Sequence, residues 1–430
     1  MKYRFNSGTC WLWLNAGAVS CCLLMLAGLL WLLLVNGLGH FWPSPVVQFT
    51  VTADSGHHPV ILGELIRTEP VPDTATAAST VVRYLIRQGK NTDGPEFRWY
   101  RSDQLSHWQL PPNAAVLERH NGSRWYMVAD EQEAMPALPD IARISYPNQM
   151  SFGQKLADYS YHLWQFLSSA PQTASAGGGI FPAIFGTVIM VLLMSVIVTP
   201  IGVMAAVYLH EYARQGLLVR LIRISVYNLA GVPSIVFGVF GLGFFVYVVG
   251  GSIDNLFYAD RLPSPVFGTP GLLWVSLTMA LLTLPVVIVS VEEGLSRIPQ
   301  ELRMGAYALG ATRAEMLWKV ILPLATPAMM TGLILAIARA AGEVAPLIFV
   351  GVVKLAPSLP VDGTFPYLHL ERKIMHLGYQ IYDSGLQSPD PDAAQSLVYA
   401  TALVLVVLIL LLNLVAIRVR NRLREKYHSV

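Results

Sequence analysis

A charged pair lies inside one of the apolar segments of the sequence. Arg339 and Glu343 are four residues apart, so a helix would place them on one face. Charged side chains at membrane depth are costly, and they usually face the interior of a helix bundle or a polar path. Two interpretations follow. The pair is either a neutralised structural contact between helices or part of a pathway for a charged solute, where Arg339 would offset an anion.

A helix break is expected in another apolar segment, which opens with residues 231–234 (GVPS). Pro233 can interrupt the helix there, and Ser234 can cap the backbone groups that the break leaves free. Discontinuous membrane helices often line a cavity, although a plain kink for packing would use the same residues. Pro233 and Ser234 therefore join Arg339 and Glu343 as candidate pathway residues.

A mixed, charged stretch at residues 301–323 separates two long apolar runs. Its pattern predicts two short helices around a turn. Pro299 suits a first helical turn, and Gly310 suits the left-handed position after a helix. Thr312 and Glu315 have the spacing of a capping box. Apolar residues at helical spacing predict one buried face on each helix. These faces are Leu302, Ala306 and Leu309, and then Met316, Leu317, Val320 and Ile321.

Several other kinds of chemistry find no support in the sequence. The only Gly-Lys pair, Gly89-Lys90, has no glycine five residues before it, so no nucleotide-binding loop is present. His57-His58 has no cluster of cysteines or carboxylates around it, and we expect no metal site, no cofactor and no catalytic residue. A DNA-binding helix-turn-helix would resemble the 301–323 stretch in shape. However, residues 292–319 contain four acids and four bases, whereas DNA binding needs a basic surplus.

The composition indicates a membrane protein. Hydrophobic residues make up 54% of the 430 residues and charged residues 13%, against roughly 25% charged in soluble domains. The mean hydropathy is +0.49. The three cysteines all lie at or inside the first apolar run, so we expect no disulfide.

Six apolar runs are long enough to cross a hydrocarbon core of ~30 Å. Lysine and arginine concentrate in alternate loops, which predicts that both termini and the 292–325 loop are cytoplasmic and that residues 41–178 lie outside. The expected spans are residues 18–38, 180–209, 225–249, 271–291, 327–350 and 396–417.

The polar segment between the first two spans reads as a β-containing domain. Short β-branched and aromatic runs predict its strands, and Asn121-Gly122 predicts a hairpin turn. An amphipathic helix is expected at 151–168, followed by a small-residue linker at 172–179. The predicted strands are residues 46–52, 59–68, 80–88, 97–100, 115–118 and 124–128.

The predicted architecture is an all-α polytopic membrane protein with a β-containing extracytoplasmic insertion between its first two helices. Residues 1–40 would hold the cytoplasmic N-terminus and the first span. Residues 41–178 would form the outer domain. Residues 179–430 would form the remaining membrane domain, with the 292–325 loop and a short basic tail.

The 301–323 stretch resembles the EAA coupling loop of ABC-importer permeases. Gly310 and the run from Val320 to Leu322-Pro323 match that pattern well. The Glu-Ala-Ala positions correspond to Met304, Gly305 and Ala306, so the usual acid is missing at Met304. Glu301, one turn earlier, could replace it, or the contact could be apolar.

Three blocks together resemble the PstA family of phosphate-transport permeases: residues 231–238, the coupling loop and residues 338–351. The resemblance covers about residues 180–420. Residues 358–391 and the RYLIRQGKNTDGPEFRWY stretch of the outer domain are similar to the longer, proteobacterial type. The resemblance implies a MetI-like type I importer fold and a place in the bacterial inner membrane.

It also implies partners: a homologous PstC-like permease, a PstB-like ATPase dimer that uses the ATP, and a periplasmic PstS-like phosphate-binding protein. The outer domain would dock the binding protein or brace the partner permease. Two other functions stay open, namely a permease for sulfate or molybdate and a membrane-anchored sensor or scaffold. A sensor would have no need of the coupling loop.

Overall fold

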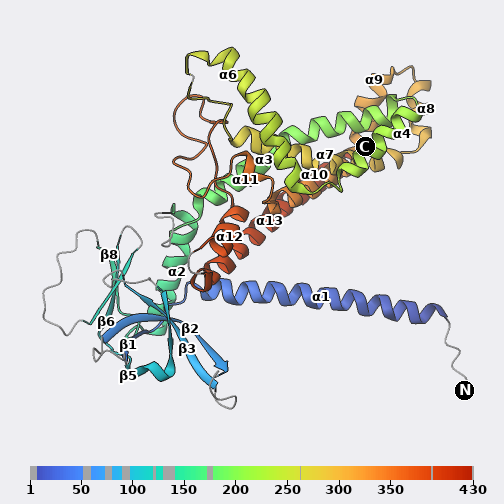
Figure 1. Cartoon of the computed structure of the whole chain (residues 1–430). Coiled ribbons are helices and arrows are strands. Elements are labelled where there is room, and N and C mark those ends of the chain that lie inside the picture. The colour runs from blue at the N-terminus through green and yellow to red at the C-terminus, as the bar shows by residue number, and fades with distance from the viewer. Residues whose placement is uncertain are drawn as a thin grey trace, which may run out of the picture. The chain divides into compact units, whose positions relative to one another are not determined.

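The computed structural model describes residues 7–51, 60–72, 80–89, 97–119, 123–128, 141–171, 178–261, 263–388 and 391–428. Two compact units divide the chain (Figure 1). The first unit is Met1–Phe181 with Asp383–Leu403, and the second is Pro182–Tyr382 with Val404–Val430.

Within the described residues, six helical segments are long and apolar enough to cross a membrane, as the sequence predicts. Several boundaries differ from the prediction: the first segment begins at Trp11, the third ends at Phe257 and the fifth begins at Arg313. Two further differences mark breaks in a helix. The third segment begins at Ser234 instead of residue 225, because residues 230–233 interrupt the helix. The fifth ends at Gly342 instead of residue 350, because Glu343 is extended and Pro346 disfavours helix before it. The segments are Trp11–Gly39, Phe181–Tyr212, Ser234–Phe257, Leu272–Ser296, Arg313–Gly342 and Ala394–Leu423.

The described part of the first unit contains two antiparallel sheets, one of five strands in the order β4-β3-β2-β1-β5 and one of three in the order β7-β6-β8. β5 and β8 add to the predicted strands. The Asn121-Gly122 turn lies outside the described residues, but the strands beside it pair antiparallel, with Glu118 opposite Arg124. The bounds are β1 (Val46–Val51), β2 (Val60–Pro72), β3 (Thr80–Gln88), β4 (Phe97–Arg101), β5 (Leu105–Gln109), β6 (Ala114–Arg119), β7 (Arg124–Val128) and β8 (Ile141–Ser145).

Successive side chains of β1 point to opposite faces of the sheet, so they pack into two separate hydrophobic clusters. Val46 packs with β6 and β7, whereas Val47 and Phe49 pack with Ile86 and Tyr100. Helix α1 (Ser7–Gly39) and helix α2 (Phe152–Ser168) complete the chain up to residue 181. A capping box of Ser151 and Gln154 begins α2, close to the predicted start of this helix.

The second unit is helical. Its third membrane segment is made of α5, a π-helical stretch and α6, and α4 precedes it as a separate helix. The bounds are α3 (Phe181–Val207), η2 (Tyr208–Tyr212), α4 (Leu217–Leu229), α5 (Ser234–Phe240), η3 (Gly241–Gly250), α6 (Gly251–Phe257), η4 (Ala259–Arg261), α7 (Leu272–Ser296), α8 (Gln300–Ala308), α9 (Arg313–Met316), η5 (Leu317–Ile321), α10 (Leu322–Gly342), α11 (Leu347–Val350), α12 (Leu377–Leu386) and α13 (Pro391–His428).

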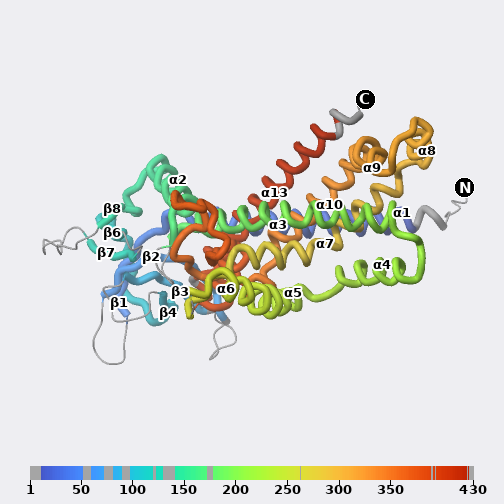
Figure 2. The backbone as a smooth tube through the Cα atoms, turned by 90° about the horizontal axis from the view of Figure 1, so that it is seen from above, coloured from blue at the N-terminus to red at the C-terminus, as the bar shows by residue number. Residues whose placement is uncertain are grey.

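Helix α7 is the centre of this unit. In the most apolar 18-residue window of α7, 67% of the residues are buried. In the corresponding windows of the other five segments the buried share is 28% or less. α10 packs along it, and small residues allow the close approach. A Cβ atom at Gly294 would lie 2.2 Å from the Cβ of Ala328, and one at Gly332 would lie 2.8 Å from the Cβ of Ser290. α8 and α9 lie at one end of the α7–α10 pair and α11 at the other (Figures 1 and 2).

Candidate functional site

The loop between α7 and α10 has the predicted helix–turn–helix form, but only the first helix, α8, is short as predicted; the second continues without a break from Arg313 to Gly342. α8 ends in a Schellman motif: Gly310 N–H donates to Tyr307 O at 2.9 Å, and Ala311 N–H donates to Ala306 O at 3.1 Å. Gly310 has a φ of +81°, which an L side chain rarely adopts. The predicted role of Gly310 as the left-handed residue after the helix is confirmed.

The second half of the loop is anchored by its N-terminus and by one buried face. Thr312 and Glu315 form the predicted capping box, with Thr312 N–H donating to the Glu315 carboxylate at 3.0 Å. Met316, Leu317 and Ile321 are each 3% exposed or less, so the predicted buried face of this helix is confirmed. α10 then begins at Leu322, with Pro323 in its first turn, where a missing N–H leaves no hydrogen bond unmade.

The predicted buried face of the first helix is wrong. Ala306 is buried, but Leu302 is 44% and Leu309 90% exposed. α8 is short and projects from the end of α7 (Figure 2), so little of it can reach the core. Met304 and Trp318 are also exposed, at 67% and 74%. Five large side chains of the loop are therefore exposed, and we call them together the tip surface: Leu302, Met304, Tyr307, Leu309 and Trp318.

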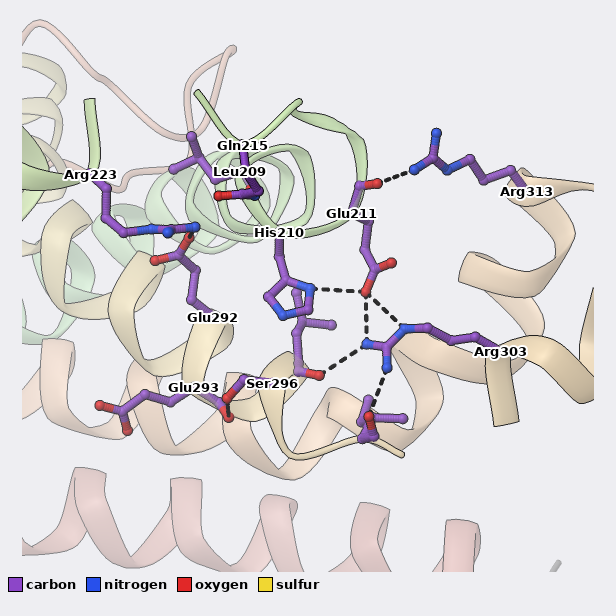
Figure 3. Close-up of polar contacts among 12 residues, drawn as sticks. Leu209, His210, Glu211, Gln215, Arg223, Glu292, Glu293, Ser296, Arg303 and Arg313 are labelled. Carbon is purple, nitrogen blue, oxygen red and sulfur yellow. Dashed lines mark hydrogen bonds and ion pairs between the residues drawn. The ribbon is translucent and has the colours of Figure 1, made fainter. Parts of the chain in front are cut away.

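One arginine fixes α8 to the rest of the unit (Figure 3). Arg303 donates to the Glu211 carboxylate from Nη2 at 2.8 Å and from Nε at 3.2 Å. It also donates to the carbonyl of Leu295, in the last turn of α7, at 3.0 Å and to that of Ile298, just past the end of α7, at 2.7 Å. A single side chain thus joins α8, the end of α7 and η2.

Two further contacts surround this arginine. His210 Nδ1 lies 3.0 Å from the same Glu211 oxygen that Arg303 contacts. Arg313, at the start of α9, donates to the backbone carbonyl of Glu211, and its guanidinium lies 4.7 Å from the centre of the Tyr212 ring. We call Arg303, Arg313, Glu211 and His210 the brace; it fixes the loop to the end of the second membrane segment.

The remaining positions of the predicted coupling loop are solvent-facing. Glu301 is exposed, and a Cβ atom at Gly305 would meet nothing within 4 Å. Neither residue contributes to the brace. The sequence does not reveal Glu211 and Arg303 as a pair, because they are 92 residues apart and share no local spacing pattern.

The Arg339–Glu343 pair is present, but its helical geometry differs from the prediction. Arg339 Nε lies 3.6 Å from Glu343 Oε1. Arg339 is in the last turn of α10, whereas Glu343 is the residue that ends the helix, with extended backbone. The two residues therefore do not share a helix face. Their side chains are 30% and 24% exposed, so the pair is not sealed in the core.

The predicted break at Pro233 is also present, between α4 and α5. Pro233 occupies the position before the first residue of α5, and Ser234 is that first residue. No side chain caps this N-terminus, so the expected capping role of Ser234 is wrong. The short turn uses backbone groups instead, because Gly231 N–H donates to Asn228 O at 3.0 Å.

A second polar cluster lies in the first unit. Glu64 on β2 is 6% exposed and accepts from Arg124 at 3.0 Å and from the Tyr126 hydroxyl at 3.1 Å. Burial by itself raises the pKa of Glu64, but the positive charge of Arg124 and these hydrogen bonds outweigh burial and lower it. The cluster therefore holds a buried carboxylate in its charged form. Among the described residues no group of histidine, cysteine and carboxylate side chains is arranged to hold a metal ion.

Comparison with known proteins identifies relatives of the second unit. Residues 198–427, more than half of the chain, match the model of the family described as "Binding-protein-dependent transport system inner membrane component". The "Phosphate transport system permease protein PstA" of Yersinia pestis is 37% identical over 185 residues, which cover 43% of this chain and 56% of that protein.

Two other relatives match a longer stretch. The "Probable ABC transporter permease protein YqgI" of Bacillus subtilis is 30% identical over 236 residues, or 54% of this chain and 74% of that protein. The "Phosphate transport system permease protein PstC" of Xylella fastidiosa is 30% identical over 235 residues, or 52% of this chain and 72% of that protein. The chain spans about half the length of the PstA relatives that it matches. With six membrane segments and a family match over most of the second unit, the chain is a multi-pass membrane protein that belongs to the family of binding-protein-dependent transport system inner membrane components.

Proposed function

We propose that this chain is the permease subunit of an ATP-driven importer that moves inorganic phosphate across the bacterial inner membrane. The choice of phosphate as the transported solute rests on the similarity to relatives named as phosphate transport permeases. The chain has no nucleotide-binding loop, so a separate ATPase subunit would hydrolyse the ATP.

The tip surface would be the contact with that ATPase. Leu309, Trp318 and Met304 are large apolar side chains that face solvent at the end of a projecting loop. Exposed apolar patches of this kind mark sites of protein association. Their apolar character favours the apolar alternative for the contact at Met304. The brace supports this role, because its hydrogen bonds connect α8 to the end of the second membrane segment and to α7. A displacement of α8 by the ATPase would therefore move these helices with it as a rigid body.

The transmembrane orientation follows from the same assignment. If the 292–325 loop is cytoplasmic, α10 crosses to the other side and residues 343–388 emerge there. Both termini are then cytoplasmic, and residues 41–178 form a periplasmic domain. Basic residues support this orientation, since five of them lie between residues 418 and 426.

The partners follow from the relatives. We infer a second, PstC-like permease beside this one, a PstB-like ATPase dimer on the tip surface and a PstS-like phosphate-binding protein outside. The family description itself names dependence on a binding protein.

The Arg339–Glu343 pair and the break at Pro233–Ser234 are the proposed pathway residues. Arg339 is partly exposed and lies at the end of α10 away from the coupling loop. A cation in such a position can attract phosphate, while Glu343 limits how tightly the anion is held.

Uptake of labelled phosphate tests the proposal, in cells that lack their own phosphate permease and contain all the partner subunits. The wild-type chain should restore uptake. Arg339→Gln should reduce uptake at least tenfold with the complex intact, whereas Arg101→Gln, which removes an exposed surface pair with Asp103, should not.

Membrane abundance and co-purification of the ATPase are measured for each variant. Restored uptake of sulfate or molybdate without phosphate would overturn the substrate and retain the permease function. No anion uptake, together with no ATPase in the purified complex, would favour the sensor or scaffold alternative.

A further inference from the structure

Helix α4 carries an unpaired arginine on an apolar surface. Leu217, Leu218 and Leu221 are 74%, 72% and 53% exposed, as expected for side chains against lipid. Arg220 is exposed among them. In the described part of the chain no carboxylate pairs with its guanidinium, whereas Arg223, one turn further on, pairs with Glu292 at 3.2 Å. A cation in apolar surroundings is stable only near water or an anion.

A cavity of about 420 Å³ adjoins this arginine. Its polar lining combines two guanidiniums with an amide and a phenol, from Arg220, Arg223, Gln215 and Tyr227. Glu292 accepts from one nitrogen of Arg223 (Figure 3), and a guanidinium carries five N–H donors in all. One carboxylate against two guanidiniums leaves the cavity with a net positive charge. The lining therefore suits an anion with several acceptor oxygens, which arginines bind best.

The cavity lies where the polar and apolar parts of a lipid would meet. It opens at the start of α4, a few residues after the second membrane segment ends at Tyr212. The adjacent Glu211 carbonyl is held by Arg313 of the coupling loop, so the cavity lies at the same end of the unit as that loop. Leu217 and Ile224 line the cavity, and both are about half exposed or more. They would lie beside the first carbons of an acyl chain.

We propose that this cavity binds a phosphate group, supplied by the headgroup of an anionic phospholipid or by inorganic phosphate. The shared chemistry is a tetrahedral anion whose oxygens accept from Arg220 and Arg223. A lipid would hold α4 against the end of α7 and so support the brace from the membrane. The proposal uses the membrane location of the chain and does not depend on phosphate being the transported solute.

The test is binding to the purified full-length complex in nanodiscs. Phosphatidylglycerol, phosphatidylcholine and inorganic phosphate are compared by native mass spectrometry and by the shift in melting temperature. Wild type should retain phosphatidylglycerol and melt at a higher temperature with it than with phosphatidylcholine. Arg220→Gln should bind it roughly tenfold more weakly, which corresponds to the loss of one charge-assisted contact. Arg220→Lys should restore part of the binding, and Arg214→Gln, outside the cavity lining, should behave as wild type.

The comparison of phosphatidylglycerol with inorganic phosphate distinguishes the two possible sources of the anion. An Arg220-dependent shift with inorganic phosphate and none with phosphatidylglycerol assigns the site to free phosphate. Equal binding of both ligands by wild type and Arg220→Gln would overturn the proposal. So would loss of the partner permease from the Arg220→Gln complex with unchanged lipid binding, because α4 would then be a protein interface. A complex that binds the lipid but moves no phosphate would overturn only the proposed function.

Discussion

At the scale of single residues, Arg303 is the strongest link between the coupling loop and the membrane helices. Its side chain is 14% exposed, and that of Glu211 is 8% exposed. Arg303→Gln would leave a buried carboxylate without its guanidinium and would remove the side-chain donors to the Leu295 and Ile298 carbonyls. We expect a loss of about 3 kcal/mol in the free energy of unfolding. The loss should appear as a lower melting temperature of the detergent-solubilised protein.

A double-mutant cycle identifies the cause of this loss. Glu211→Gln combined with Arg303→Gln removes the uncompensated charge, so the pair should be less destabilised than the sum of the single variants. Arg297→Gln is the matched control, because Arg297 is exposed at the end of α7 and takes no part in the brace. Strict additivity of the two single variants would contradict the brace.

Alanine substitutions at two glycines of the same loop should have opposite effects on stability. Gly310 has a φ of +81°, so Gly310→Ala should destabilise the loop by about 1 kcal/mol. Gly305 lies inside α8 with open space around it, so Gly305→Ala should be neutral or stabilising by up to about 1 kcal/mol. Rates of limited proteolysis in the loop measure both. Equal rates for the two variants would show that the turn at Gly310 is not needed.

At the scale of elements, the tip surface predicts a separation between folding and coupling. Leu309 is 90% exposed and touches little of its own chain, so Leu309→Asp should leave the melting temperature unchanged. The same change should release the ATPase, because a desolvated charge in an apolar interface costs several kcal/mol. Co-purification of the ATPase with the tagged permease measures the effect.

The control for this variant is Leu386→Asp on α12, where the leucine is 76% exposed outside the membrane segments. It should retain the ATPase. If Leu309→Asp also retains the ATPase, the tip surface is not the coupling contact.

The sequence predicts an element correctly where residues close together in the chain determine it. The Schellman glycine and the Thr312–Glu315 capping box follow from residues within one or two helical turns, and the apolar segments follow from the hydropathy of about 20 consecutive residues. The start of the third membrane segment and the end of the fifth could not be predicted in this way. Apolar residues continue through α4 and through α11, so hydropathy extends both spans beyond the places where Pro233 and Pro346 end the helix. β8, with the sequence IARIS, could not be predicted because it is short and its two isoleucines are three residues apart, which does not fit the alternation of a strand.

The brace could not be predicted, for a different reason. Arg303 and Glu211 are ordinary charged residues in their own helices, and only the packing of η2 beside α7 brings them together. The same holds for Arg124 and Glu64 in the first unit, which lie 60 residues apart. Such pairs depend on tertiary structure, whereas capping motifs depend on a few consecutive residues.

At the scale of the whole molecule, the stability of the first unit should depend on pH through one buried carboxylate. The first unit holds the Glu64 carboxylate, whose pKa in the folded protein is lowered. A carboxyl with a lowered folded pKa stabilises the fold above its unfolded pKa of about 4.3, and this stability is lost as pH falls through the lower folded pKa. The first unit should therefore lose protection against hydrogen exchange below about pH 4.

Glu64→Gln tests the origin of this effect. The variant should be less stable than wild type at pH 7, and the difference should shrink as the pH falls below about 4. Hydrogen exchange of the β2 and β7 amides follows the first unit, and that of the α7 amides is the internal reference. A difference that stays constant between pH 7 and pH 3 would contradict the role of the Glu64–Arg124 pair.

The most direct test of the central claim is transport by the reconstituted complex. The permease, its PstC-like partner and the ATPase are placed in proteoliposomes with the binding protein outside and ATP inside, and labelled phosphate uptake is measured. We predict uptake that requires ATP and the binding protein, and that Leu309→Asp abolishes while the chain remains folded. Phosphate uptake that continues without ATP, or that Leu309→Asp leaves unchanged, would contradict the account of this chain as an ATP-coupled phosphate permease.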